Sequence, residues 1–152
     1  MPQLHRTALL TCSAARMFAV VNDIASYPEF LPWCRDAQVL ERQSAPEVDA
    51  RAETMVASLQ LAAKGFTESF TTRNLAIPDR RVELELVSGP FSHFQGRWEI
   101  AAIGDAGCRT ELFVDFEFRR GLTLLSRLVA GSLASSADRI LDAFCQRAEA
   151  QP

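Results

Sequence analysis

The middle of the chain alternates apolar and polar residues with a period of two. Residues 81–87 place three aliphatic side chains on one side of an extended chain and two glutamates on the other. Residues 109–118 repeat the pattern, with a row of apolar side chains that ends at Phe116 and Phe118. Strands with one polar side are typical of an antiparallel sheet that packs on one face only. The sequence therefore predicts such a sheet, whose apolar face needs a cover.

The same alternation, interrupted by turns that contain proline or glycine, predicts seven strands. They span residues 4–10, 36–42, 48–59, 65–74, 81–87, 94–102 and 109–118. Ser13 is a good N-cap for a short helix at residues 14–21, and Asp23 can cap another turn that ends near Pro28.

The last part of the chain has helical periodicity. Residues 122–148 contain no proline, and their apolar residues recur on a single helical face. Such a helix would be about 40 Å long, but it carries too many charged residues to cross a membrane. It is the only element large enough to cover the sheet. We therefore predict an α+β helix-grip fold, with a curved antiparallel sheet of about six to seven strands around a long C-terminal helix, as one domain spanning 1–152.

Residues 27–34, Tyr-Pro-Glu-Phe-Leu-Pro-Trp-Cys, form an unusually apolar loop. Pro32 lacks an amide donor and disfavours helix at Leu31, so the segment suits neither a regular helix nor a central strand. Its large side chains must be buried in the protein's own core or against a ligand. Our hypothesis is a gate at the open end of the sheet, where Phe30, Leu31 and Trp33 touch a ligand or a membrane.

Composition excludes several classes of site. The net charge of −3 argues against nucleic-acid binding by bulk electrostatics, although a local basic patch is compatible with it. None of the four cysteines is spaced like a metal clip, and with only two histidines no zinc site is expected. The first residues contain no apolar signal segment, which predicts a cytoplasmic protein with free thiols. Neither a phosphate-binding glycine loop nor a Gly-x-Ser-x-Gly motif is present.

Few polar side chains suggest chemistry. His93 is the only imidazole in the middle of the chain and is interpreted as a polar strand residue. The acids of residues 109–118 are interpreted as a solvated strand face, because period-two spacing rarely makes a pair of general acids. Arg73 could bind an anion or a polar head group, or pair with an acid on a neighbouring strand. Trp98 is expected in the core, whereas Trp33 suits a pocket or the core equally well.

Five short motifs occur in order along nearly the whole chain. They are Ser-Tyr-Pro-Glu-Phe-Leu-Pro at 26–32, Ser-Phe-Thr-Thr-Arg-Asn at 69–74, Gly-Pro-Phe at 89–91, Gly-Arg-Trp at 96–98 and Asp-Phe-Glu-Phe at 115–118. Together they resemble the coenzyme Q-binding START-like family of the polyketide cyclase/START superfamily, whose bacterial members are of the ribosome association toxin type.

This resemblance implies an apolar cavity between the sheet and the long helix, where an isoprenoid quinone binds without a metal or a catalytic group. The residues that it implies at the cavity mouth are Tyr27, Phe30, Leu31, Pro32 and Trp33. Those implied inside are Phe70 and Phe116, and those in the helical wall are Leu125, Val129 and Leu133. Arg73, Phe91 and Trp98 complete the predicted ligand-binding set.

The first functional hypothesis is a protein, not an enzyme, that binds ubiquinone or another lipid and supports respiratory electron transport. It is expected in the cytoplasm with a peripheral contact to the inner membrane. Burial of an apolar ligand supplies affinity without any catalytic group. The alternative is the toxin of a type II toxin–antitoxin pair, which binds the large ribosomal subunit and blocks subunit association. Its second partner would be a small antitoxin protein.

The distribution of surface charge distinguishes the ribosome-binding hypothesis from the lipid-binding one. A ribosome binder should show a basic face. The arginines available for one are Arg6, Arg16, Arg35, Arg42, Arg51 and Arg73.

The third hypothesis is an enzyme of the cyclase or aromatase kind, which needs polar groups that converge inside the cavity. It ranks last because the inward-facing positions are almost all apolar.

Overall fold

The computed structural model describes residues 3–63, 66–119 and 139–150. These residues form seven strands: β1 (Gln3–Leu10), β2 (Cys34–Ser44), β3 (Glu53–Ala63), β4 (Phe66–Ile77), β5 (Arg81–Ser88), β6 (Phe91–Ile103) and β7 (Gly107–Phe118). Three helical elements accompany them: α1 (Ala14–Asn22), the 3-10 helix η1 (Ile24–Glu29) and α3 (Ile140–Ala150). Within these ranges no helix is long and apolar enough to span a bilayer.

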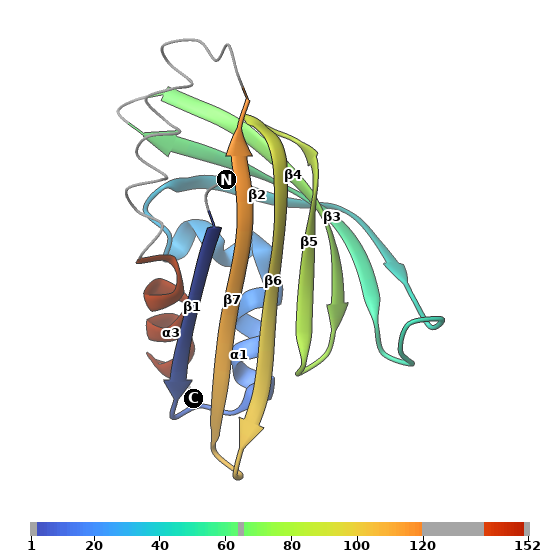
Figure 1. Cartoon of the computed structure of the whole chain (residues 1–152), viewed down its shortest axis with the longest axis vertical. Helices are drawn as coiled ribbons and strands as arrows, with labels where there is room; N and C mark the ends of the chain where they lie inside the picture. The colour runs from blue at the N-terminus through green and yellow to red at the C-terminus, as the bar shows by residue number, and fades with distance from the viewer. Residues whose placement is uncertain (1–2, 64–65, 120–138, 151–152) are drawn as a thin grey trace.

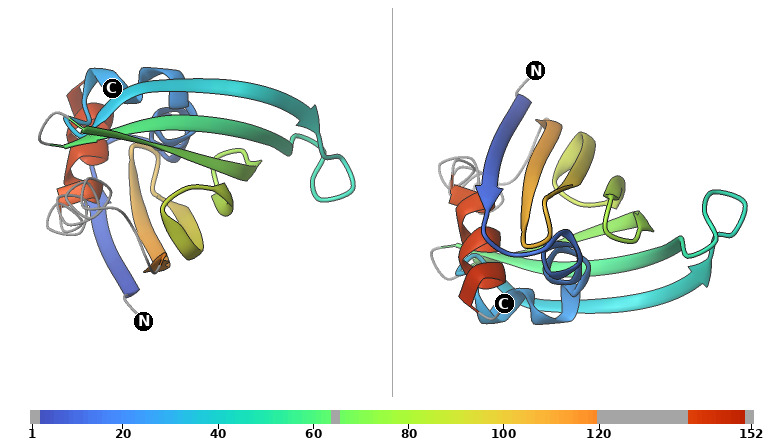
Figure 2. Two further views of the ribbon diagram at one scale, coloured as in Figure 1. Left: turned by 90° about the horizontal axis from the view of Figure 1, so that it is seen from above. Right: turned by 90° about the horizontal axis from the view of Figure 1, so that it is seen from below.

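All seven strands join one antiparallel sheet in the order β1-β7-β6-β5-β4-β3-β2. The first strand therefore pairs with the last, so that Leu4 lies opposite Val114. The sheet twists strongly and curves around the helical elements (Figures 1 and 2). Register shifts in β2, β5 and β6 contribute to this bend, because an extra residue on one strand kinks the pairing. The predicted α+β helix-grip architecture is confirmed.

Several strand boundaries differ from the sequence prediction, and the largest difference is at the start of β3. β3 starts at Glu53 and not at residue 48, because residues 45–52 form the turn after β2. The amide of Ala45 closes that turn on the carbonyl of Ala52 at 2.9 Å. Val48 looked like a strand residue because it is apolar, but it lies in this turn with 49% of its surface exposed. β2 is correspondingly longer than predicted and runs from Cys34 to Ser44.

The short helix forms where the sequence predicts it. The Ser13 hydroxyl caps α1 by accepting a hydrogen bond from the amide of Arg16 at 3.1 Å. The guanidinium of Arg16 then donates to the carbonyls of Ala148 (3.3 Å) and Arg147 (3.2 Å) at the end of α3. These bonds satisfy carbonyls that have no partner inside their own helix. The first helix therefore fixes the position of the last one.

The final turns of the predicted C-terminal helix are present as α3. This helix buries Leu141, Phe144 and Ala148 against the core. Its last turn is also tied to the end of β1, since the carboxylate of Glu149 accepts hydrogen bonds from both the amide and the hydroxyl of Thr11 at 2.9 Å. Residues 122–138 of the predicted helix lie outside the described residues.

Candidate functional site

An apolar cavity lies between the inner face of the sheet and the elements η1 and α3. Its volume is about 160 Å³, close to that of an engineered cavity of about 150 Å³ that admits benzene. The described residues that line it are Leu4, Ile24, Tyr27, Trp33, Leu59, Leu61, Phe70, Thr72, Asn74, Leu84, Phe91, Phe94, Trp98, Leu112, Val114, Phe116, Phe118, Ile140 and Phe144. The cavity can therefore hold one ring-sized group.

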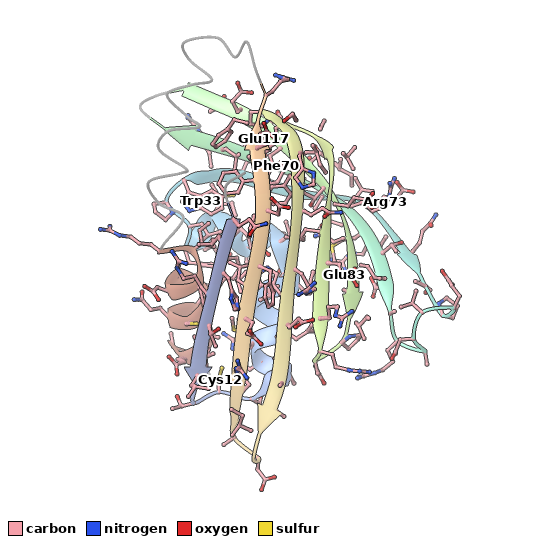
Figure 3. All side chains as sticks on the ribbon, viewed as in Figure 1. Cys12, Trp33, Phe70, Arg73, Glu83 and Glu117 are labelled. Atoms are coloured by element: carbon pink, nitrogen blue, oxygen red, sulfur yellow. The ribbon has the colours of Figure 1, made fainter. Side chains whose placement is uncertain are left out.

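Five phenylalanine side chains from β4, β6 and β7 gather at one end of the cavity. This phenylalanine cluster consists of Phe70, Phe91, Phe94, Phe116 and Phe118. Neighbouring ring centroids in it lie 4.8 to 6.2 Å apart, the usual spacing of favourable aromatic contacts. Figure 3 shows Phe70 and Trp33 near this end of the sheet. The cluster forms an apolar end wall that a flat or flexible apolar group can contact.

A register shift in β6 makes the phenylalanine cluster possible. Phe91 and Phe94 are three residues apart, so strict alternation would put them on opposite faces of the strand. The register shift between Phe91 and His93 turns both rings to the inner face, where their centroids lie 5.2 Å apart. Just before it, Gly89 leaves room for the ring of Phe70, whose Cδ1 would lie 3.0 Å from any Cβ at that position.

The other end of the cavity is closed by aromatic side chains from η1 and α3. The ring of Phe144 lies 4.7 Å from Trp98, 5.1 Å from Tyr27 and 5.2 Å from Phe30. The Tyr27 hydroxyl donates a hydrogen bond to the carbonyl of Val21. Burial raises the pKa of Tyr27 above its usual value. This end is therefore packed, and Tyr27 contributes no charge to it.

Two polar side chains interrupt the apolar wall. Thr72 and Asn74 on the inner face of β4 are only 8% and 2% exposed, and the Thr72 hydroxyl donates to Oδ1 of Asn74 at 2.7 Å. Among the described lining residues there is no Asp, Glu, His, Lys or Arg. Such a lining can bind a neutral molecule, and the described part of it offers no acid and base for proton transfer.

The outer face of the sheet, opposite to the cavity, is charged. His5 contacts Glu111 at 3.0 Å and His93 contacts Asp115 at 3.4 Å. Arg73 is exposed on this face, where it follows the inward-facing Thr72 and borders a polar hollow of about 700 Å³. The acids of β7 thus lie on a polar strand face, as the alternation predicts, and His93 lies among them.

Three of the six arginines proposed for a basic face have partners within the protein. Arg42 pairs with Glu53 at 3.6 Å and Arg51 pairs with Asp79 at 3.9 Å. Arg16 is engaged with the end of α3. Acids therefore neutralise two of the six, and a third has a structural role.

The cysteines are free thiols in chemically quiet surroundings. Cys12, Cys34 and Cys108 are buried and Cys145 is half-buried. Burial raises the pKa of the Cys34 thiol to about 11 and that of Cys145 to about 12, so both are protonated and poorly nucleophilic at neutral pH. Across the described ranges no group of three or more histidine, cysteine or acidic residues could hold a metal ion.

Comparison with known proteins identifies the family of this chain. A family described as polyketide cyclase / dehydrase and lipid transport matches residues 10–145. The chain belongs to this family. The resemblance drawn from its short motifs is therefore confirmed at the level of the superfamily.

Several curated proteins are similar to this chain over most of its length. The chain is 36% identical to the ribosome association toxin RatA of Pseudomonas aeruginosa over 146 residues, which cover 96% of this chain and 94% of the relative. It is 38% identical to the protein of the same name from Escherichia coli over 126 residues, covering 83% of this chain and 75% of the relative. These relatives are named for ribosome association and not for an enzymatic reaction.

Solved structures agree with the fold. The Zhui aromatase/cyclase from Streptomyces sp. R1128 superimposes with a TM-score of 0.78 at 17% identity, covering 97% of this chain and 93% of that one. An 18 kDa protein from Caulobacter crescentus gives a TM-score of 0.68 at 26% identity, covering 99% of this chain and all of that one. At 17% identity, the likeness to the aromatase/cyclase shows the helix-grip fold alone.

Some of the predicted ligand-binding residues line the cavity and others do not. The predicted residues that line the cavity are Tyr27, Trp33, Phe70, Phe91, Trp98 and Phe116. The predicted residues Leu125, Val129 and Leu133 lie outside the described residues. That the lining residues contact a ligand stays a prediction.

Four predicted residues are not in the cavity lining. Leu31 is 1% exposed and belongs to the core, and Phe30 packs on Phe144. Pro32 is exposed, and Arg73 lies on the outer face. The gate hypothesis is therefore wrong for Leu31, because the loop uses this side chain to attach itself to the core, whereas for the half-buried Phe30 it stays a prediction. Only Trp33 of the three gate residues reaches the cavity.

Sequence reasoning missed the polar pair in the cavity wall. The sequence pattern could have revealed this pair, because Thr72 and Asn74 are two and four residues after Phe70 along β4 and therefore share its inward face. Phe94 and Phe118 were placed on strands but not assigned to the site. Phe144 could not be assigned from pattern, since its contact with Trp98 depends on where α3 docks.

Proposed function

We propose that this protein is a ribosome association factor of the toxin type, which binds the large ribosomal subunit and prevents it from joining the small subunit. The observation that carries this proposal is the 36% identity to a ribosome association toxin over 96% of the chain. The large subunit and a small antitoxin protein are its proposed partners, and the cytoplasm is its proposed location.

The charges of the protein determine how its binding to the ribosome should depend on salt. With a net charge of −3 and several arginines paired with acids, binding must rely on local complementarity more than on total charge. A protein that neutralises six or more phosphates loses about a thousandfold or more in affinity between 50 and 200 mM salt. We expect a much weaker salt dependence here.

Sucrose-gradient sedimentation tests the ribosomal role. Purified protein is added to separated subunits before they are allowed to associate. We expect fewer assembled ribosomes, more free subunits and protein in the large-subunit fractions. Leu31→Asp, which puts a charge into the core and should unfold the domain, is the matched inactive control. Unchanged levels of assembled ribosomes with the folded protein would refute the proposal.

The cavity supports a second proposed function, the binding of a neutral apolar ligand such as ubiquinone. Its support is a cavity of about 160 Å³ with an uncharged, mostly aromatic and aliphatic described lining. A quinone ring suits this volume. An isoprenoid tail does not fit in the same space and would have to extend past the phenylalanine cluster. A role in respiration and a peripheral membrane contact belong to this second proposal.

Lipid extraction and mass spectrometry of the purified protein test ligand binding directly. We expect ubiquinone or another neutral lipid in the extract, or uptake of decylubiquinone by the delipidated protein. Val114→Phe should fill the cavity and reduce uptake, because Val114 lines it. Val87→Phe, at a site that is 48% exposed, is the matched control. An empty extract together with no uptake would rule out this function.

A further inference from the structure

Asn74 is an unusual residue for the wall of an apolar cavity. It is 2% exposed and lines the cavity between β4 and the helical elements. Leaving a buried amide without a hydrogen-bond partner costs about 1–3 kcal/mol. A leucine at this position would avoid that cost, so the amide needs an explanation.

The hydrogen bonds of Asn74 orient its amide group. Its Oδ1 accepts from the Thr72 hydroxyl at 2.7 Å, and Thr72 is itself 8% exposed. The amide nitrogen carries two donors, and the hydrogen bond to Thr72 engages only the oxygen of the amide. Thr72 therefore holds the amide in place by its oxygen and leaves the donor side available.

The neighbouring strands leave space beside this donor. Asn74 lies in register with Leu84 on β5, and Leu84 lies in register with Gly96 on β6. The side chain of Leu84 leans over Gly96, where its Cδ1 would be 3.0 Å from a Cβ. Leu84 is thereby directed toward β6, and both Leu84 and Asn74 line the cavity.

The cavity restricts the ligand by charge and by size. No charged side chain is among its described lining residues, so a carboxylate or an ammonium group would lose its hydration without gaining a counterion. A volume of about 160 Å³ admits one six-membered ring with small substituents. A pure hydrocarbon would fit, but it would leave the donors of Asn74 unpaired.

We propose that the cavity binds a neutral, ring-sized molecule that carries a carbonyl-type acceptor, and that the amide nitrogen of Asn74 donates a hydrogen bond to this acceptor. Thr72 is a positioning residue that holds the amide by its oxygen. The apolar remainder of the ligand points toward the phenylalanine cluster. Aryl ketones and quinones share this chemistry. The inference rests on the proposed ligand-binding function and adds the ligand's polar contact and orientation.

Calorimetric titration with two ligands of similar shape tests the inference. Acetophenone carries a carbonyl oxygen where isopropylbenzene carries a methyl group. The double variant Thr72→Val/Asn74→Leu removes both polar partners together, which is less disruptive than removing one of them. We expect it to weaken acetophenone binding about three- to tenfold relative to isopropylbenzene. Thr71→Val, on the outer face, is the matched control and should leave both affinities unchanged.

Each outcome has a separate meaning. If neither ligand binds the wild-type protein, the ligand-binding function and this inference both fail. If both ligands bind and the double variant changes their affinities equally, only the inference is overturned. If circular dichroism shows that the double variant is unfolded, the side-chain amide resonance of Asn74 in the wild-type protein decides. That resonance must shift with acetophenone and not with isopropylbenzene, and equal shifts would overturn the inference.

Discussion

Replacing Leu31 by alanine should destabilise the whole domain. Leu31 is 1% exposed and belongs to the main hydrophobic core, although the sequence places it in a loop between two prolines. Its amide donates to the carbonyl of Tyr27 at 2.9 Å and its carbonyl accepts from Cys34 at 3.0 Å, so the backbone cannot easily move to refill the space. The side chain therefore anchors the loop to the core.

The size of this effect follows from the buried atoms. Leu31→Ala removes three carbons at about 0.8 kcal/mol each, or about 2.4 kcal/mol of transfer free energy. The cavity that remains raises the loss in unfolding free energy to about 3–4 kcal/mol. For a domain of this length, that lowers the melting temperature by about 6–16 °C.

Thermal and urea unfolding measure the change, and an exposed leucine provides the matched control. Leu9→Ala is the same substitution at a side chain that is 74% exposed, and it should cost under about 1 kcal/mol. If Leu31→Ala unfolds like the wild type within about 0.5 kcal/mol, the loop is not part of the core. The gate hypothesis would then return for Leu31.

The structure supports two further predictions. Tyr27 is the only tyrosine, and burial raises its pKa above the ordinary value near 10, so its neutral form favours the native state below that pH. Stability should fall by about 1.4 kcal/mol per pH unit above about 10, and the phenolate absorbance of Tyr27 should appear only with unfolding. The stability of Tyr27→Phe, which has no tyrosine to ionise, should fall less steeply over the same pH range, and phenolate in the native wild-type protein would contradict this. Arg16→Met removes the donors to the carbonyls of Ala148 and Arg147, so we expect a loss of about 1–3 kcal/mol and faster amide exchange in α3. Unchanged exchange would show that Arg16 does not hold that helix.

The sheet was predictable because its polar and apolar faces alternate. Residues 81–87 illustrate this, since Val82 is 1% exposed while Glu83 and Glu85 lie on the outer side. The boundaries of β3 were not predictable in this way, because an apolar residue in a turn, Val48, has the same pattern as one in a strand. Hydrogen bonds across the turn decide such a boundary, and the sequence does not show them.

The cavity was only partly predictable. Period-two spacing assigns Phe70 and Phe116 to the inner face, and both line the cavity. The loop at residues 27–34 was misjudged for a physical reason: an apolar loop residue can be buried by the core or by a ligand, and composition does not distinguish the two. Leu31 contributes to the core, while Trp33 lines the cavity. The volume itself depends on how closely η1 and α3 approach the sheet.

The pairing of β1 with β7 also sets when this protein can first be complete. Gln3 is synthesised long before its partner Asp115, and β1 has no other neighbour among the described strands of the sheet. At about 5–20 residues per second, β1 waits about 5–20 s for its partner strand. During that time the cavity wall lacks the β7 residues Val114 and Phe116. If the protein acts on ribosomes, each ribosome that synthesises it must translate most of the chain before a complete domain exists to bind any ribosome.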